Sequence, residues 1–101
     1  MALKAAFIFV APEADPAVHR AQVITPVVEL TVVGAQNYAQ AEQVARALVD
    51  EGIGAIELCG GFGHDGTARI VKAVQGRAAV GVVRFDCHPG LEGKSGDALF
   101  G

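Results

Sequence analysis

The stretch Gly54–Thr67 constrains the fold more than any other part of the chain. Its first half, residues 55–59, is apolar and suits a buried strand, and glycines at positions 60, 61, 63 and 66 precede a segment with helical periodicity. A strand that runs through a glycine-rich turn into a helix is typical of α/β domains, and such a turn presents backbone N–H groups at a helix N-terminus. The stretch therefore predicts an α/β fold and a place where an anion can bind.

Apolar runs of strand length recur on both sides of this stretch. We expect strands at residues 3–11, 27–33, 55–59 and 80–85. Helices are expected from Pro16 to about Ile24, from the N-cap Asn37 to Gly52, and from Gly66 to Gly76. The βαβαβαβ order predicts one α/β domain over residues 1–101, with a four-stranded, mostly parallel sheet that is flavodoxin-like or half-barrel-like. Residues 86–101 are turn-rich and are expected to form an irregular C-terminal tail.

Composition narrows the partners that such a chain can have. Half of its 101 residues are hydrophobic, so the sheet has more apolar surface than three short helices can cover, and we expect a homo-oligomer. A net charge of −3 without a Lys/Arg cluster argues against nucleic acid and against a membrane surface. Two cysteines and no secretory signal indicate reduced thiols and a cytoplasmic location.

Side chains that can transfer protons follow the last two predicted strands. His64 comes after the strand at 55–59, and Asp86 and His88 come after the strand at 80–85. Because the carboxyl ends of parallel strands share one edge of the sheet, we expect these side chains to meet there. With Glu57, inside a strand, they form the set of candidate catalytic residues, and Glu57 or His64 is the expected general base.

The glycine-rich turn itself predicts a ligand-binding site. Gly60, Gly61, Gly63 and Gly66 allow close approach to backbone amides, the Thr67 hydroxyl adds a donor, and Arg84 adds positive charge. The expected ligand is a small phosphate- or carboxylate-bearing metabolite, and no particular cofactor is implied.

Three alternatives remain open for the same residues. Gly61-x-Gly63-x-x-Gly66 matches a dinucleotide fingerprint, with Asp86 about 20 residues downstream, and so allows nicotinamide or another nucleotide. A zinc or iron site is the second alternative, built from Cys59, His64, Asp65, Cys87 and His88, although their spacing matches no metal motif and we expect no metal. In the third, the glycines serve turns only and the protein is a non-catalytic subunit of a homo-oligomer.

Charged side chains inside the predicted strands need an explanation of their own. Glu57 and Arg84 lie on neighbouring strands and either form a structural ion pair or, with Glu29, line a polar pocket or a barrel-like interior.

Two resemblances add to this interpretation. The chain resembles a small bacterial family of uncharacterised proteins of similar length, through residues 4–11, 55–63, 80–86 and 94–100. Locally, Ala45–Glu57 is similar to a segment of keto-deoxy-phosphogluconate-type aldolases, which are TIM barrels. That similarity implies a barrel-like interior into which Glu57 points and a role for Glu57 in proton transfer. The Schiff-base lysine of those enzymes has no counterpart late in a predicted strand.

Overall fold

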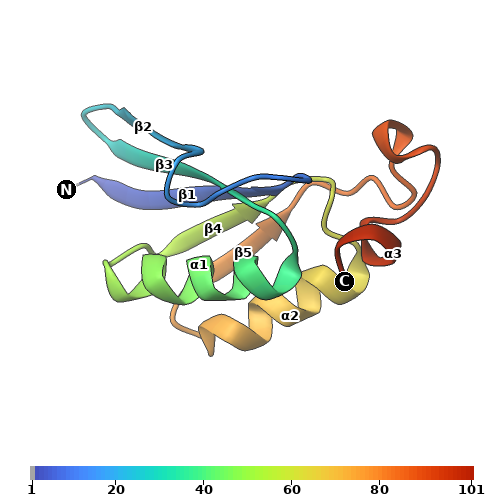
Figure 1. Cartoon of the computed structure of the whole chain (residues 1–101). Coiled ribbons are helices and arrows are strands. Elements are labelled where there is room, and N and C mark those ends of the chain that lie inside the picture. The colour runs from blue at the N-terminus through green and yellow to red at the C-terminus, as the bar shows by residue number, and fades with distance from the viewer. Residues whose placement is uncertain (1) are drawn as a thin grey trace.

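The computed structural model describes residues 2–101 and is built on a five-stranded sheet (Figure 1). The strands lie in the order β2-β3-β1-β4-β5, and all neighbours are parallel except β2 and β3. The strands are β1 (Leu3–Val10), β2 (Arg20–Ile24), β3 (Val28–Ala35), β4 (Ala55–Leu58) and β5 (Ala79–Val82). The helices are α1 (Tyr38–Asp50), α2 (His64–Val74) and α3 (Gly96–Phe100), with a 3₁₀ turn, η1, at Pro89–Leu91.

Strand β2 takes the place of the helix predicted from Pro16 to Ile24, and that prediction was wrong. Asp15 begins only a turn. Its side chain accepts a hydrogen bond from Ala17 N, and its carbonyl accepts from Val18 N and His19 N. From Arg20 the chain pairs with β3 in antiparallel register. Ala21 and Val23, two residues apart, point to the same side of the β2–β3 pair, as residues of a strand do at every second position. The sheet therefore has five strands rather than four, and the order βαβαβαβ is incorrect.

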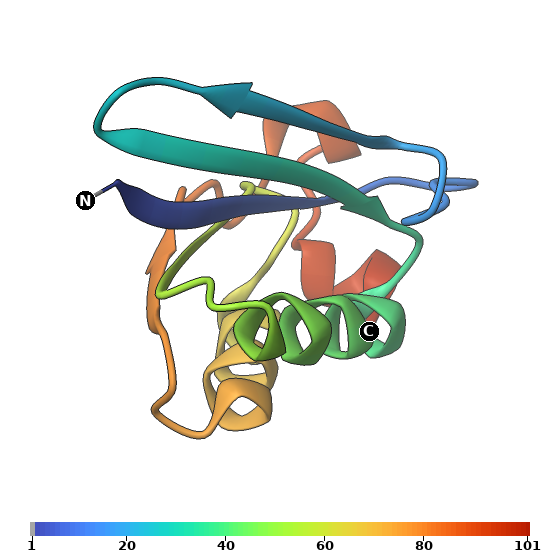
Figure 2. The same cartoon turned by 90° about the vertical axis from the view of Figure 1, so that its left-hand side faces the viewer.

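Helices α1 and α2 both pack on the same face of the sheet (Figures 1 and 2). Asn37 caps α1 through a hydrogen bond from Gln40 N, as the sequence predicts, and α1 buries the expected stripe that includes Val44 and Leu48. Beneath the helices the core is formed by alternate strand residues such as Ile8, Val33 and Leu58. The opposite face of the sheet carries no further layer of structure among residues 2–101.

The strand register separates the charged residues that were expected to share a face. Glu57 lies beside Phe7 and Gly81, on the face away from the helices. Glu29 lies beside Lys4 on the helix face, and alternation from Val82 puts Arg84 on the helix face as well. The predicted pairing of Glu57 with Arg84 was therefore wrong, and these residues do not line a common pocket.

The C-terminal tail is more ordered than expected. It forms η1 and then α3, whose Phe100 is buried in the core, and Gly96 packs against the carbonyl of Gly61. The tail therefore closes over the glycine-rich turn at the carboxyl end of β4. No helix among residues 2–101 has the length and apolar character needed to cross a membrane.

Candidate functional site

The glycine-rich turn connects β4 to α2 as predicted, but the chain itself fills the space beside its glycines. A Cβ atom at Gly61 would lie 2.8 Å from the Val10 side chain. Cβ atoms at Gly60, Gly63 and Gly66 would overlap Phe85, Asp97 and the Tyr38 ring, respectively. The glycines are therefore required for packing within the protein, since any larger residue would displace one of these neighbours.

The carboxylate of Asp97 occupies the N-terminus of α2. Asp65 N donates to its Oδ2 at 2.9 Å and Gly66 N donates to its Oδ1 at 3.0 Å. Gly63, the N-cap residue of α2, has no side chain to satisfy these amides, which have no partner within the helix. The protein's own carboxylate thus accepts the hydrogen bonds that we assigned to a bound anion.

Tyr38 completes this arrangement from the first turn of α1. Its hydroxyl accepts from Gly63 N at 3.0 Å and donates to Asp97 Oδ1 at 2.8 Å, with the Gly61 carbonyl at 3.2 Å. Its ring stacks on Phe62 at 5.4 Å between centroids. Tyr38 therefore joins α1, the glycine-rich turn and α3 at one point.

The pKa of Tyr38 is raised and the pKa of its partner Asp97 is lowered. Burial raises the pKa of the Tyr38 hydroxyl above its ordinary range, so it stays protonated and can donate. Burial alone would also raise the pKa of Asp97, but hydrogen bonds from Asp65 N, the Tyr38 hydroxyl and Gly66 N hold it below its ordinary value. Asp97 is consequently an anion at neutral pH.

Three predicted site residues do meet at the rim of this turn. His64 Nδ1 lies 3.3 Å from Asp86 Oδ2, and Arg84 Nη2 lies 3.3 Å from the same oxygen. Arg84 Nη1 also donates to the Phe62 carbonyl at 3.1 Å. The Asp86 side chain is only 14% exposed, whereas that of His64 is 81% exposed. Arg84 thus positions Asp86, whose carboxylate lies beside a histidine side chain that is mostly open to solvent.

The remaining predicted residues lie apart from this cluster. His88 Nδ1 accepts from Gly90 N within its own loop, and its ring packs against Phe85. Glu57 is exposed on the face away from the helices. The Thr67 hydroxyl is buried and has no hydrogen-bond partner among the described residues. No hydrogen bond or ion pair among residues 2–101 links any of these three to His64.

Sequence reasoning missed Tyr38 and Asp97, the two residues that organise the turn. Tyr38 is the single tyrosine of the chain and lies in the first turn of a predicted helix, in phase with its apolar stripe, so it looks like an ordinary core residue. Asp97 lies 31 residues from the amide of Gly66, so no local spacing connects them. The available signal was Ser95-Gly96-Asp97 itself, because Ser95 caps α3 and predicts a short helix there.

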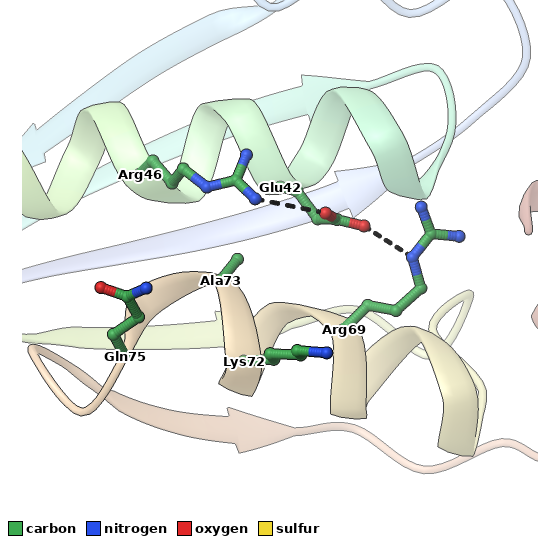
Figure 3. Close-up of a pocket in the computed structure, with 6 residues that line it drawn as sticks. All are labelled: Glu42, Arg46, Arg69, Lys72, Ala73 and Gln75. Carbon is green, nitrogen blue, oxygen red and sulfur yellow. Dashed lines mark hydrogen bonds and ion pairs between the residues drawn. The ribbon is translucent and has the colours of Figure 1, made fainter.

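A separate groove lies between α1 and α2, with a volume of about 380 Å³ (Figure 3). Arg69 Nε donates to Glu42 Oε2 at 2.6 Å, and Arg46 Nη2 lies 3.4 Å from the other oxygen of that carboxylate. Lys72 lies beside Arg69 on α2. The groove thus has three cationic side chains around one carboxylate. It is lined by Glu42, Arg46, Arg69, Lys72, Ala73 and Gln75.

No group of three or more His, Cys, Asp or Glu side chains in residues 2–101 is arranged to hold a metal ion. The five residues of the zinc or iron alternative are thus not gathered into a metal centre, and Cys87 is exposed in the tail while Cys59 is half-buried.

The chain was compared with curated proteins, solved structures and family models. No curated protein and no solved structure matched it, so the similarity to aldolases is not supported. A family model matched residues 3–98, nearly the whole described chain. The chain therefore belongs to a family of unknown function, DUF6506.

Proposed function

We propose that the protein binds a small anionic metabolite at the carboxyl ends of β4 and β5, where His64 transfers a proton to or from it. The observation that carries this proposal is the cluster of His64, Asp86 and Arg84. A carboxylate near one ring nitrogen of a histidine favours the orientation in which the other nitrogen faces solvent and can act as acid or base.

Two side chains at the rim can donate to an anionic ligand, beside the carboxylates of Asp86 and Asp97. Arg84 has a guanidinium that is one-third exposed, and His64 gains positive charge when protonated. His64 is the first residue of α2 and Arg84 contacts the Phe62 carbonyl just before it. The positive end of this helix adds to the attraction, even though Asp97 accepts two of its amide hydrogen bonds. The Asp86 carboxylate lies between these two side chains, so a phosphate or carboxylate group would reach His64 and Arg84 from the solvent side, where charge-assisted hydrogen bonds can form.

The nucleotide alternative has less support from the same geometry. Dinucleotide folds place a pyrophosphate on the amides at the helix N-terminus and use glycines to let it approach. Here Asp97 accepts from those amides, and the neighbours of Gly61, Gly63 and Gly66 fill the space. A ligand at the rim, outside the turn, fits this arrangement better.

Thermal unfolding with a panel of ligands tests the proposal. Inorganic phosphate, a sugar phosphate, a dicarboxylate and a nucleotide are added separately, and a bound ligand raises the melting temperature by mass action. We expect a rise with at least one phosphate or carboxylate compound, and its loss in Arg84→Ala and His64→Ala. Arg77→Ala and His19→Ala are matched controls, because Arg77 pairs with Asp50 and His19 lies in the β1–β2 loop.

The cationic groove between α1 and α2 is a second place where an anion could bind, so a variant of the groove is compared with a variant of the strand-end cluster. Lys72→Ala removes a cation from that groove and leaves the strand-end cluster intact. If Lys72→Ala abolishes the thermal shift and Arg84→Ala does not, the ligand binds in the groove and the proposed site is wrong. An unchanged melting temperature across the whole panel would also overturn the proposal.

A further inference from the structure

One face of the sheet is apolar and has no layer of structure against it. We call this the open face and define it by the strand side chains that alternate away from the helices. They are Ala21 and Val23 of β2, Val28, Leu30 and Val32 of β3, Leu3, Ala5, Phe7 and Phe9 of β1, Ala55 and Glu57 of β4, and Ala79 and Gly81 of β5. Leu30, Val32, Phe7 and Phe9 are only partly buried, and Val23 is 56% exposed.

The open face is unusual for a parallel sheet. Parallel sheets are normally covered on both faces, because crossover connections place helices on each side. Here both crossover helices lie on one face, and the connection from β1 to β3 runs through the hairpin strand β2 instead of a helix (Figure 2). The second face is left without the covering that its apolar side chains require.

Charge is nearly absent from this surface. Glu57 is the one charged side chain among the strand residues that define it. A Cβ atom at Gly81 would lie 3.9 Å from Glu57 Cγ, so Glu57 lies over Gly81, toward the β5 edge and away from Leu30 and Val32. The strand residues over β1 and β3 therefore carry no charge themselves, although His19 and Arg20 border Phe9 and Val32 at one end.

We propose that the open face binds a second copy of this chain. Because the patch is apolar and has little net charge, two copies of it do not repel each other. Two chains can therefore pair about a twofold axis, with each chain burying the same patch. The strand side chains that define the open face include no basic residue, which disfavours nucleic acid or an anionic membrane as the occupant. This inference is independent of the proposed ligand site, which lies at the strand ends.

The size of the open face is sufficient for such a pairing. Five strands at about 4.8 Å spacing, with a mean length of about 20 Å, give roughly 500 Å² per copy. Two copies would then bury about 1,000 Å² in total, which is where specific interfaces begin. This estimate treats the face as flat, so side chains that project from it increase the area that can be buried. The exposed Val83, next to the end of β5, adds to it as well.

Analytical ultracentrifugation of the full chain at micromolar to submillimolar concentration tests the proposal. We expect the wild type to sediment with the mass of two chains. Val32→Glu places a charge at the apolar centre and should halve that mass, and Val23→Glu should do the same from a position that is exposed in the monomer. Val71→Glu is the matched control, since Val71 is an exposed valine on α2, outside the open face, and should leave the dimer intact.

Circular dichroism of each variant shows whether it remains folded, and Val23→Glu decides the outcome if Val32→Glu unfolds. A wild type that remains a single chain throughout this concentration range overturns the proposal and assigns the open face to a different partner. A dimer that survives Val23→Glu and Val32→Glu, or that is lost in Val71→Glu, overturns it as well, because the interface then lies elsewhere.

Discussion

The Tyr38 hydroxyl and the Asp97 carboxylate, 59 residues apart, share a 2.8 Å hydrogen bond beneath the first turn of α2. Joined by this bond, a side chain of α1 and a side chain of α3 satisfy backbone amides that Gly63 cannot cap. The glycine-rich turn is therefore shaped by a cap supplied from elsewhere in the chain.

Tyr38→Phe should destabilise the protein by about 1–3 kcal/mol, because it leaves Gly63 N without its acceptor and removes a donor to Asp97. The ring and its stacking on Phe62 are retained, so the loss reports on the hydroxyl alone. Urea unfolding of the two proteins measures the difference. A free energy of unfolding equal to that of the wild type would show that water replaces the hydroxyl without cost.

Asp97→Asn should lower the free energy of unfolding at neutral pH by about 1–3 kcal/mol, since hydrogen bonds to a charged group are lost. The pKa of Asp97 is lower in the folded state than its ordinary value of 3.8. The contribution of its charge is therefore present above the unfolded pKa and is lost as the pH falls through the folded pKa.

The difference between wild type and Asp97→Asn should accordingly shrink as the pH is lowered below about 5. Urea unfolding at a series of pH values checks this dependence. Asp50→Asn is the control, because Asp50 pairs with Arg77 at the surface and such pairs contribute little. A difference that stays constant down to acid pH would contradict the assignment of Asp97 as the charged cap.

Gly66→Ala should destabilise the protein by about 1–3 kcal/mol, because the new methyl group overlaps the Tyr38 ring, which has no room to move. Gly54→Ala is the matched control, since a Cβ atom at Gly54 meets nothing within 4 Å. Thermal unfolding of both variants separates packing from the general effect of replacing glycine. Equal melting temperatures for the two variants would show that the overlap is relieved at no cost.

Arg69→Met should be more costly than Arg46→Met, although both arginines contact Glu42. Arg69 joins α2 to α1 at 2.6 Å and lies 5.6 Å from the centre of the Tyr38 ring, whereas Arg46 is half-exposed and reaches Glu42 at 3.4 Å within α1. We expect a loss of about 0.5–1.5 kcal/mol for Arg69 and less than about 0.5 kcal/mol for Arg46. Double-mutant cycles with Glu42→Gln in urea measure each coupling, and a larger coupling for Arg46 would reverse this ranking.

The parts of the fold that depend on local signals were predicted well. Asn37 and the apolar stripe of α1 lie within one helix, and the strand–turn–helix pattern around residues 55–74 is continuous in sequence. The segment from Pro16 to Ile24 was misassigned because Asp15-Pro16 is a strong helix-start signal. The alternation of Ala21 and Val23 is short, and it becomes informative only when β3 is present to pair with it.

The candidate site was predictable only in part. His64, Asp86 and His88 were expected to meet at the carboxyl edge of the sheet because parallel strands end together. The structure puts His64 and the ligand-binding candidate Arg84 each 3.3 Å from Asp86, whereas His88 lies apart. The cap by Asp97 and the opposite faces of Glu57 and Arg84 depend on how the tail folds back and on strand register. Neither is encoded in the spacing of residues along the chain.

The cap of α2 also sets an order of events during synthesis. Residues 64–74 are synthesised before Asp97, so until the tail is made the first amides of α2 can bond only to water. Only when residues 95–100 emerge can the tail close on Gly61 and supply the carboxylate. Final consolidation of this domain is therefore expected after translation of its last helix rather than during translation of its sheet.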